Sequence, residues 1–155
     1  MGDRETTNQP PEAPIERALS AVRQVLEMDV AFVSEFVEDR LIFRAVEGDG
    51  ESFGWREGDD FSLEESYCKR VLDGRIASVV PDSRHQDATR DLWVTSAANI
   101  GSYCAVPLVL SDGRPYGTLC CVSHSPDPWL AERDLALMGD LAREMVQRLE
   151  SEGDL

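Results

Sequence analysis

The sequence predicts an α+β fold, in which helices flank an antiparallel sheet and the two terminal helices pack together on one face. Two strand-like runs follow each other at residues 30–46, and a hairpin pattern occupies residues 101–123. Segments with helical spacing lie at both ends of the patterned region. With antiparallel pairs in both halves of the chain, this order favours an α+β sandwich over a doubly wound sheet.

The first half of the chain begins with residues 1–14, where three prolines among polar residues predict a disordered leader. A helix that ends near Met28 follows, because apolar residues recur at helical spacing at Ile15, Leu19, Val22 and Leu26. Strands are expected at 30–37 and 41–46, joined by a short turn and followed by a loop at 48–54.

The middle of the chain carries a helix start signal. Ser62 followed by Glu65 fits a capping box, which predicts a helix from Leu63 to Leu72 that stops at Gly74. A short strand is expected at 76–80. Residues 83–99 then form a loop with one short helix around 91–98.

The hairpin at 101–123 has Asp112-Gly113 between two apolar runs, which is a strong turn signal. Pro107 cannot donate to the ladder, so its strand is an edge or is irregular at that point. A long last helix begins near Asp127-Pro128 and carries an apolar stripe at Leu135, Met138, Leu141, Met145 and Leu149. Residues 151–155 are a tail.

Composition limits the classes of function. The 155 residues suit one domain, expected at residues 15–150, and a net charge of −15 disfavours nucleic acid and anionic lipid as partners. No apolar run approaches the ~20 residues of a membrane helix, and the first residues lack the apolar core of a secretory signal. A cytoplasmic location without membrane contact is therefore expected.

The cysteines and histidines give no metal signature. The four cysteines have no CxxC spacing, and only two histidines are available, so we expect no metal site. The cysteines are expected to be reduced core residues. These residues are Cys68, Cys104, Cys120, Cys121, His85 and His124.

Four short stretches occur in a characteristic order: YCKRVLDGR, SYCAVPL, YGTLCCVS and LAERDLALMGDLA. Together they resemble GAF domains over Ile15 to Leu149, including those of bacterial signalling proteins that are joined to cyclic-dinucleotide enzymes. The resemblance implies a ligand cavity between one sheet face and two covering segments, here residues 62–73 and 82–99.

Polar and aromatic residues of these segments and of the first hairpin strand are the candidate ligand-binding residues, because ligand pockets combine apolar walls with a few polar groups. Each also has a structural explanation: Tyr67 and Trp93 suit core aromatics, and Arg84, His85 and Asp87 suit a surface cluster. The sequence identifies neither the ligand nor a cofactor. The candidates are Tyr67, Cys68, Asp82, Arg84, His85, Trp93, Ser102, Tyr103 and Cys104.

The resemblance also suggests several specific activities and cofactors, and for each one the sequence can be searched for the residues that it requires. Free methionine sulfoxide reductases are GAF enzymes with cysteines near the cavity; Cys68 lies near one such position, but the companion segment ATRDLWVTSAAN has no cysteine. No Cys-His pair suits a bilin, no NKxxF pattern suits a cyclic nucleotide, and no haem context is found. We therefore expect a non-catalytic sensory or regulatory domain with no catalytic residues.

Two alternatives remain open. One is a thiol enzyme of the free methionine sulfoxide reductase type that uses Cys68, with Cys104 as a possible second thiol. The other is a dimerisation scaffold with a filled cavity. A homodimer is expected through residues 15–28 and 130–149, because the apolar stripe of the last helix outruns the sheet. The alternative to a homodimer is that the first and last helices only cover the outer face of their own sheet.

Overall fold

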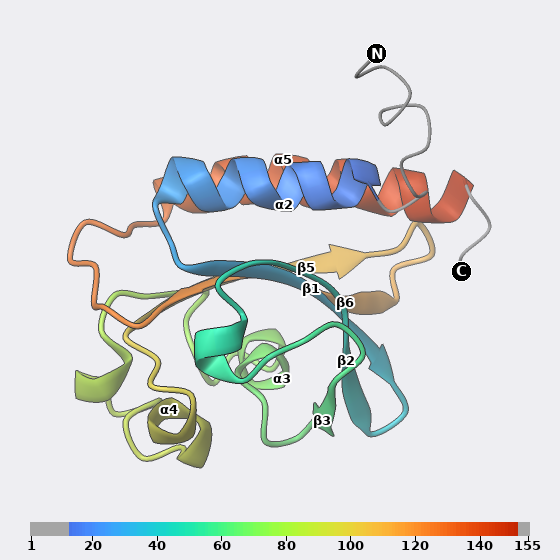
Figure 1. The fold of residues 1–155 in the computed structure, drawn as a ribbon. Coiled ribbons are helices and arrows are strands. Elements are labelled where there is room, and N and C mark those ends of the chain that lie inside the picture. The colour runs from blue at the N-terminus through green and yellow to red at the C-terminus, as the bar shows by residue number, and fades with distance from the viewer. Residues whose placement is uncertain (1–12, 152–155) are drawn as a thin grey trace.

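The computed structural model describes residues 13–151 and consists of three layers (Figure 1). Helices α2 (Ala13–Leu26) and α5 (Arg133–Ser151) lie side by side on one face of the sheet. Short helices and loops cover the other face. The expected leader and tail fall outside the described residues except for Ala13, Pro14 and Ser151, which belong to the two terminal helices. Within residues 13–151, no helix is both long enough and apolar enough to cross a membrane.

The sheet has six strands in the order β3-β2-β1-β6-β5-β4, and all neighbours are antiparallel. This arrangement confirms the expected α+β architecture. The strands are β1 (Val30–Val37), β2 (Arg40–Gly48), β3 (Asp60–Ser62), β4 (Val79–Val80), β5 (Ser102–Val109) and β6 (Pro115–Ser123).

Strand alternation divides the buried residues into two cores. Because successive side chains of a strand point to opposite faces, Ala31 and Val33 pack under the terminal helices, whereas Phe32 packs against the covering segments. Cys120 and Cys121 of β6 divide in the same way. The sheet therefore has no solvent-exposed face at its centre.

The hairpin forms as expected. Gly113 donates its N–H to the carbonyl of Leu110, and Leu110 donates to Arg114. Pro107 pairs with Thr118 of β6, while β4 pairs only with Tyr103 and Cys104. The sheet thus ends at β5 beside Pro107, where the missing donor costs no ladder bond.

The helix over the cavity starts later than the capping-box pattern indicates. Ser62 instead ends strand β3, where it pairs with Arg40. Helix α3 (Tyr67–Leu72) begins after Ser66, whose Oγ accepts a hydrogen bond of 3.1 Å from the Lys69 N–H. Ser66 also donates to the carbonyl of Leu63 (2.7 Å). Pairing with β2 takes Ser62 out of helical geometry, so the next serine along the chain caps the helix.

Two further boundaries differ from the sequence expectations. The strand expected at 76–80 pairs only over Val79–Val80. The last helix begins at Arg133 rather than at Asp127, because Asp127 donates its N–H to Pro81 and accepts the Trp129 N–H on its own carboxylate. These bonds hold residues 127–130 in a turn.

The expected short helix in 83–99 is present as α4 (Trp93–Ala97). It is preceded in the chain by the 3-10 helices η1 (Glu51–Phe53) and η2 (Ser83–His85).

The apolar stripe of α5 packs against its own sheet and α2. Met138, Met145 and Leu149 are all buried in the single chain. The reason for expecting a homodimer, an uncovered stripe, is therefore absent, although the homodimer itself stays a prediction. Met145→Glu would place a charge in this core and would not report on an interface.

Two glycines should respond in opposite directions to alanine. A Cβ at Gly117 would lie 1.7 Å from the carbonyl oxygen of Ser34 in β1, so Gly117→Ala must push the central strands apart. On helix α5, a Cβ at Gly139 meets only the end of the Arg143 side chain at 3.9 Å. We expect Gly117→Ala to lower the free energy of unfolding by roughly 3 kcal/mol or more and Gly139→Ala to raise it by about 0.5–1 kcal/mol. Urea unfolding measures both, and equal stabilities would contradict the central pairing of β1 with β6.

Candidate functional site

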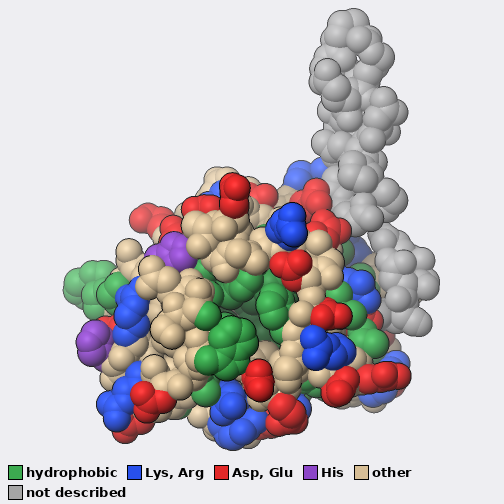
Figure 2. Space-filling model, turned by 60° about the horizontal axis from the view of Figure 1, so that its bottom comes forward, with side chains coloured by type: hydrophobic (Ala, Val, Ile, Leu, Met, Phe, Trp, Pro, Cys, Tyr) green, Lys and Arg blue, Asp and Glu red, His purple; other side chains and the backbone are tan. Residues whose placement is uncertain are grey.

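A cavity of about 90 Å³ lies between the sheet and the segments that cover its second face. Figure 2 shows hydrophobic side chains gathered in a hollow on this side of the molecule. Half of the fourteen lining residues are aromatic, and Glu65 is the only one that carries a formal charge. They are Phe32, Leu41, Phe43, Trp55, Phe61, Ser62, Glu65, Ser66, Tyr67, Cys68, Trp93, Val94, Ile100 and Tyr103.

One wall is an aromatic cluster built on β1, β2 and β3. Phe32 and Phe43 face each other across the strand pair with ring centroids 4.5 Å apart, and Trp55 meets both edge-on at 5.5 and 5.6 Å. Phe61 lies 5.0 Å from Phe43. Such ring pairs stabilise one another beyond their burial, so the rings of this wall hold one another in place through their mutual contacts.

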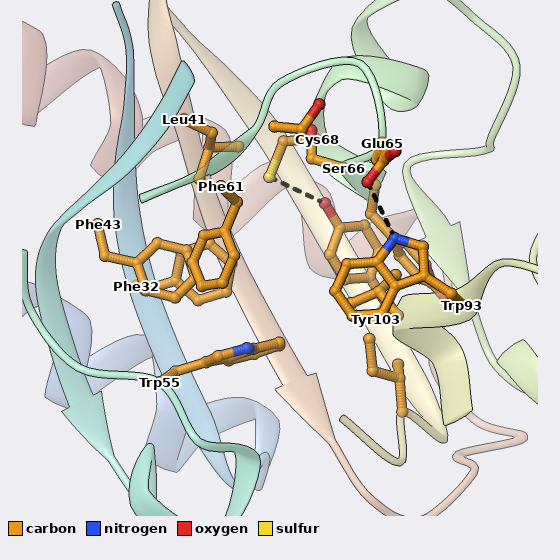
Figure 3. Close-up of a pocket in the computed structure, with 14 residues that line it drawn as sticks. Phe32, Leu41, Phe43, Trp55, Phe61, Glu65, Ser66, Cys68, Trp93 and Tyr103 are labelled. Atoms are coloured by element: carbon orange, nitrogen blue, oxygen red, sulfur yellow. Dashed lines mark hydrogen bonds between the residues drawn. The ribbon is translucent and has the colours of Figure 1, made fainter. Parts of the chain in front are cut away.

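The opposite wall comes from α3, α4 and β5 (Figure 3). The rings of Tyr67 and Tyr103 meet edge-on with centroids 4.8 Å apart. At the surface, the Trp93 indole N–H donates to Glu65 at 3.1 Å, and Trp93 is 57% exposed. The Trp93–Glu65 pair therefore stands where the cavity meets solvent.

A chain of buried hydroxyl groups fastens the covering segments to one another. The Tyr67 hydroxyl is hydrogen-bonded to the Thr95 hydroxyl, which donates to the carbonyl of Thr89 at 2.6 Å. Thr89 in turn donates to the carbonyl of Ser83, also at 2.6 Å. Burial raises the pKa of Tyr67, so its proton remains available for this bond.

Two thiols meet beside the cavity, of which only Cys68 lines it. Cys68 of α3 and Cys120 of β6 have Sγ atoms 3.5 Å apart, and the Tyr103 hydroxyl lies 3.5 Å from each. Cys120 also reaches the hydroxyl of Thr118 (3.3 Å), which is hydrogen-bonded to Ser34 (2.7 Å). The two sulfurs are thus the first members of a buried hydrogen-bonded chain that runs through Thr118 of β6 to Ser34 of β1.

Hydrogen bonds separate the acidities of the two thiols. The bond with Cys120, assisted by Thr118 and Tyr103, lowers the pKa of Cys68 to about 7, although burial acts in the opposite direction. Burial and the neighbouring Cys68 raise the pKa of Cys120 well above its usual range. Burial and the two sulfurs likewise raise the pKa of Tyr103, which keeps its proton. A single negative charge on the pair therefore resides on Cys68.

Four of the nine candidate residues line the cavity: Tyr67, Cys68, Trp93 and Tyr103. Ser102 and Cys104 do not, because they flank Tyr103 on β5 and point to the helical face. Ser102 donates to the carbonyl of Ser125 at 2.8 Å. Cys104 lies 3.5 Å from the sulfur of Met138 and 3.9 Å from that of Met28.

The remaining three candidates, Asp82, Arg84 and His85, lie outside the cavity lining. Arg84 donates to the Asn99 side chain (2.5 Å) and to the carbonyl of His124 (2.7 Å), which fastens the covering segment to the end of β6. His85 is an exposed side chain paired with Asp82 at 2.9 Å. The surface cluster of Arg84, His85 and Asp87 considered from the sequence does not form as such, because Asp87 pairs with Arg90 at 3.1 Å while Arg84 and His85 have the separate partners given above.

The lining residues that were not among the sequence candidates come mostly from β1, β2, β3 and the loops beside β3. Strand alternation places Phe32 on one face, and the same rule applied to β2 would have placed Leu41 and Phe43 beside it. Trp55 and Phe61 carry no periodic signal. In the described part of the chain, no three His, Cys, Asp or Glu side chains are grouped so that they could hold a metal ion.

Residues 10–149 match the profile of the GAF domain family. The chain belongs to this family. Its relatives in signalling proteins include a cyclic di-GMP phosphodiesterase of Pseudomonas aeruginosa, 27% identical over 86% of the chain, and the diguanylate cyclase DgcP of Escherichia coli, 29% identical over 88%. The chain spans only 22% and 40% of these two proteins.

Among solved structures, the GAF domain is similar to a type II free methionine-R-sulfoxide reductase from Thermoplasma acidophilum. The TM-score is 0.69 at 13% identity, with 91% of this chain and 93% of the other covered. At this identity the likeness establishes a shared fold and carries no statement about activity.

The acidity of Cys68 gives a pH-dependent prediction. Its alkylation by a small neutral reagent such as iodoacetamide should accelerate from about pH 6 to about pH 8 as the thiolate forms, and then level off. The hydrogen bond with Cys121 and burial raise the pKa of Cys104, so its labelling should stay slow throughout. Peptide mass spectrometry of quenched samples follows each cysteine separately. Faster labelling of Cys104 than of Cys68 would contradict the assignment.

Proposed function

We propose that this GAF domain is a non-catalytic sensory or regulatory module of a cytoplasmic signalling protein and that it binds a small molecule in the cavity described above. The observation that carries the proposal is the cavity itself, with two aromatic walls and an entrance beside Trp93. A domain that served only as a scaffold would gain stability by filling this space. Its relatives' cyclic di-GMP chemistry is consistent with a signalling context.

The lining favours a small ligand that is largely apolar and either neutral or cationic. No Lys, Arg or His is among the fourteen lining residues, and Glu65 stands at the entrance. The chain as a whole carries a net charge of −15. Phosphate-bearing ligands such as cyclic dinucleotides would therefore meet repulsion without a compensating donor set.

Binding would be transmitted through the central strands. Strands β1, β2 and β5 contribute both to the cavity and to the opposite core: in β1, Phe32 lies beside Ala31 and Val33, which pack under α2 and α5. A ligand that prefers one arrangement of the covering segments shifts the population of that arrangement, and the sheet passes the change to the terminal helices. These helices are where the chain continues outside residues 13–151.

A thiol enzyme is the second candidate, and the Cys68–Cys120 pair is the observation in its favour. Cys104, the second thiol considered from sequence, is separated from Cys68 by the sheet. An enzyme for free methionine sulfoxide would also have to position the carboxylate and amine of this substrate, and the cavity lining offers no cationic group for the carboxylate.

Ligand occupancy should depend on the cavity. Val94 lines it from α4, whereas Ser96 of the same helix is exposed. We expect native mass spectrometry of freshly purified protein to detect a retained small molecule, which Val94→Phe loses by filling the space and Ser96→Phe keeps. In ligand-free protein, benzene serves as the apolar probe and should raise the thermal unfolding temperature only when Val94 is intact. No occupancy in either assay would contradict the proposal.

The non-catalytic assignment can be tested directly. With free methionine sulfoxide and a thioredoxin system, we expect NADPH consumption to stay at the rate without protein, since no second thiol lies in residues 88–99 and no cation holds the substrate. Sulfoxide-dependent turnover that disappears in Cys68→Ser would make this protein an enzyme instead.

A further inference from the structure

We propose that Cys68 and Cys120 form an oxidation site for small organic hydroperoxides, in which Cys68 is oxidised from the cavity and Cys120 then closes a disulfide with it. This inference rests on the proposed function in one respect, since the cavity must admit a small molecule. It adds the chemical class of one such molecule and a covalent outcome.

The geometry supports a disulfide between these two residues. Their sulfurs are 3.5 Å apart, and a disulfide bond is about 2.05 Å long, so a relative movement of about 1.5 Å joins them. Cys120 is fixed in the central strand β6, between β1 and β5. Cys68 lies in the first turn of a six-residue helix beside the cavity, and this short element is the one that can move.

The two thiols have different access, which assigns their roles. Cys68 lines the cavity, so a molecule inside it meets this sulfur directly. Cys120 is fully buried and is absent from the cavity lining, so it is shielded behind Cys68 (Figure 3 shows Cys68 directed at the Tyr103 hydroxyl). Cys68 is therefore the attacking thiol and Cys120 the resolving thiol.

The surrounding donors favour the reactive form of Cys68. The Cys120 thiol has one proton and three acceptors within reach: the Cys68 sulfur at 3.5 Å, the Thr118 hydroxyl at 3.3 Å and the Tyr103 hydroxyl at 3.5 Å. Tyr103 donates its hydroxyl proton to Cys68. These bonds stabilise a thiolate on Cys68, the form that attacks peroxides. The apolar walls favour an alkyl or aryl hydroperoxide over hydrogen peroxide, which is smaller and more strongly hydrated.

The reaction balances in two steps. The Cys68 sulfur attacks the terminal oxygen of the hydroperoxide; the O–O bond breaks, Cys68 becomes a sulfenic acid, and the alcohol leaves with the proton that the Cys68 thiol lost. Cys120 then attacks the sulfenic sulfur; the S–S bond forms, the S–O bond breaks, and the oxygen leaves as water with the Cys120 proton. The hydroperoxide gains two electrons, and the two sulfurs together lose two.

The chain contains a matched control pair. Cys104 and Cys121 are directly opposite each other on β5 and β6 and are equally buried. They face the helical core and do not line the cavity. If oxidation depends on the cavity, this second pair stays reduced although its residues are also adjacent.

The experiment treats reduced, desalted protein with tert-butyl hydroperoxide and follows free thiols and intact mass. We expect the free thiols of the unfolded, quenched protein to fall from four per chain to two, with loss of two hydrogen atoms, and the non-reduced peptide map to join Cys68 to Cys120. Dithiothreitol should restore all four. Hydrogen peroxide is expected to react more slowly at equal concentration.

Variants separate the roles. Cys68→Ser should lose the reaction, whereas Cys120→Ser should stop at a sulfenic acid on Cys68 that dimedone traps. Cys104→Ser and Cys121→Ser should form the Cys68–Cys120 disulfide at the wild-type rate. Val94→Phe should slow it, and Ser96→Phe should not. Circular dichroism and thermal unfolding establish that each variant is folded, and the dimedone adduct tests the site even if one serine variant is unstable.

Several outcomes would overturn the inference: a disulfide that includes Cys104 or Cys121, equal oxidation of Val94→Phe, or thiols that remain free under conditions that oxidise a control dithiol. If the thiols stay inert while Val94→Phe still abolishes occupancy by a retained molecule or benzene, only the oxidation site fails. If the disulfide forms while no occupancy is detected by either assay, the proposed ligand-binding function fails instead.

Discussion

The alternation of side chains along β1 and β6 is the constraint on which the rest of this structure depends. Both strands are central, so each of their residues is committed to one of two cores. Gly117 allows the two strands to approach, because its missing side chain leaves room for the Ser34 carbonyl. The cavity lies on one face of this strand pair, and the terminal helices pack on the other face.

The cavity persists because its cover is fastened independently of whatever fills it. The Tyr67, Thr95 and Thr89 hydroxyls form a buried chain that links α3 to the following segment, and Arg84 ties that segment to the end of β6. Buried hydroxyls without partners would be costly, so these bonds specify the position of the cover. The thiol pair lies beneath this cover, with Cys68 on α3 and Cys120 on the central strand β6, so a reactive group stands where the helix meets the sheet.

Sequence patterns failed where two local signals competed for one stretch. Ser62 and Glu65 fit a capping box, but Ser62 pairs with β2 and Ser66 caps the helix. The start signal at Asp127 was used for a turn instead of a helix. The stripe around Met145 predicts an uncovered surface only because the sequence does not reveal how far the sheet and α2 extend beneath it.

Periodicity and turn signals were enough to predict the terminal helices, β1, the hairpin and the position of Pro107 at the free side of β5. The resemblance to GAF domains indicated the covering segments, and four of the polar and aromatic residues chosen within them and on the first hairpin strand line the cavity. Only the tertiary structure decided which face of β5 looks into the cavity, and thus that Tyr103 lines it while Ser102 and Cys104 do not. Pairing of Cys68 with Cys120 was equally hidden, since 52 residues separate them and long-range strand order brings them together.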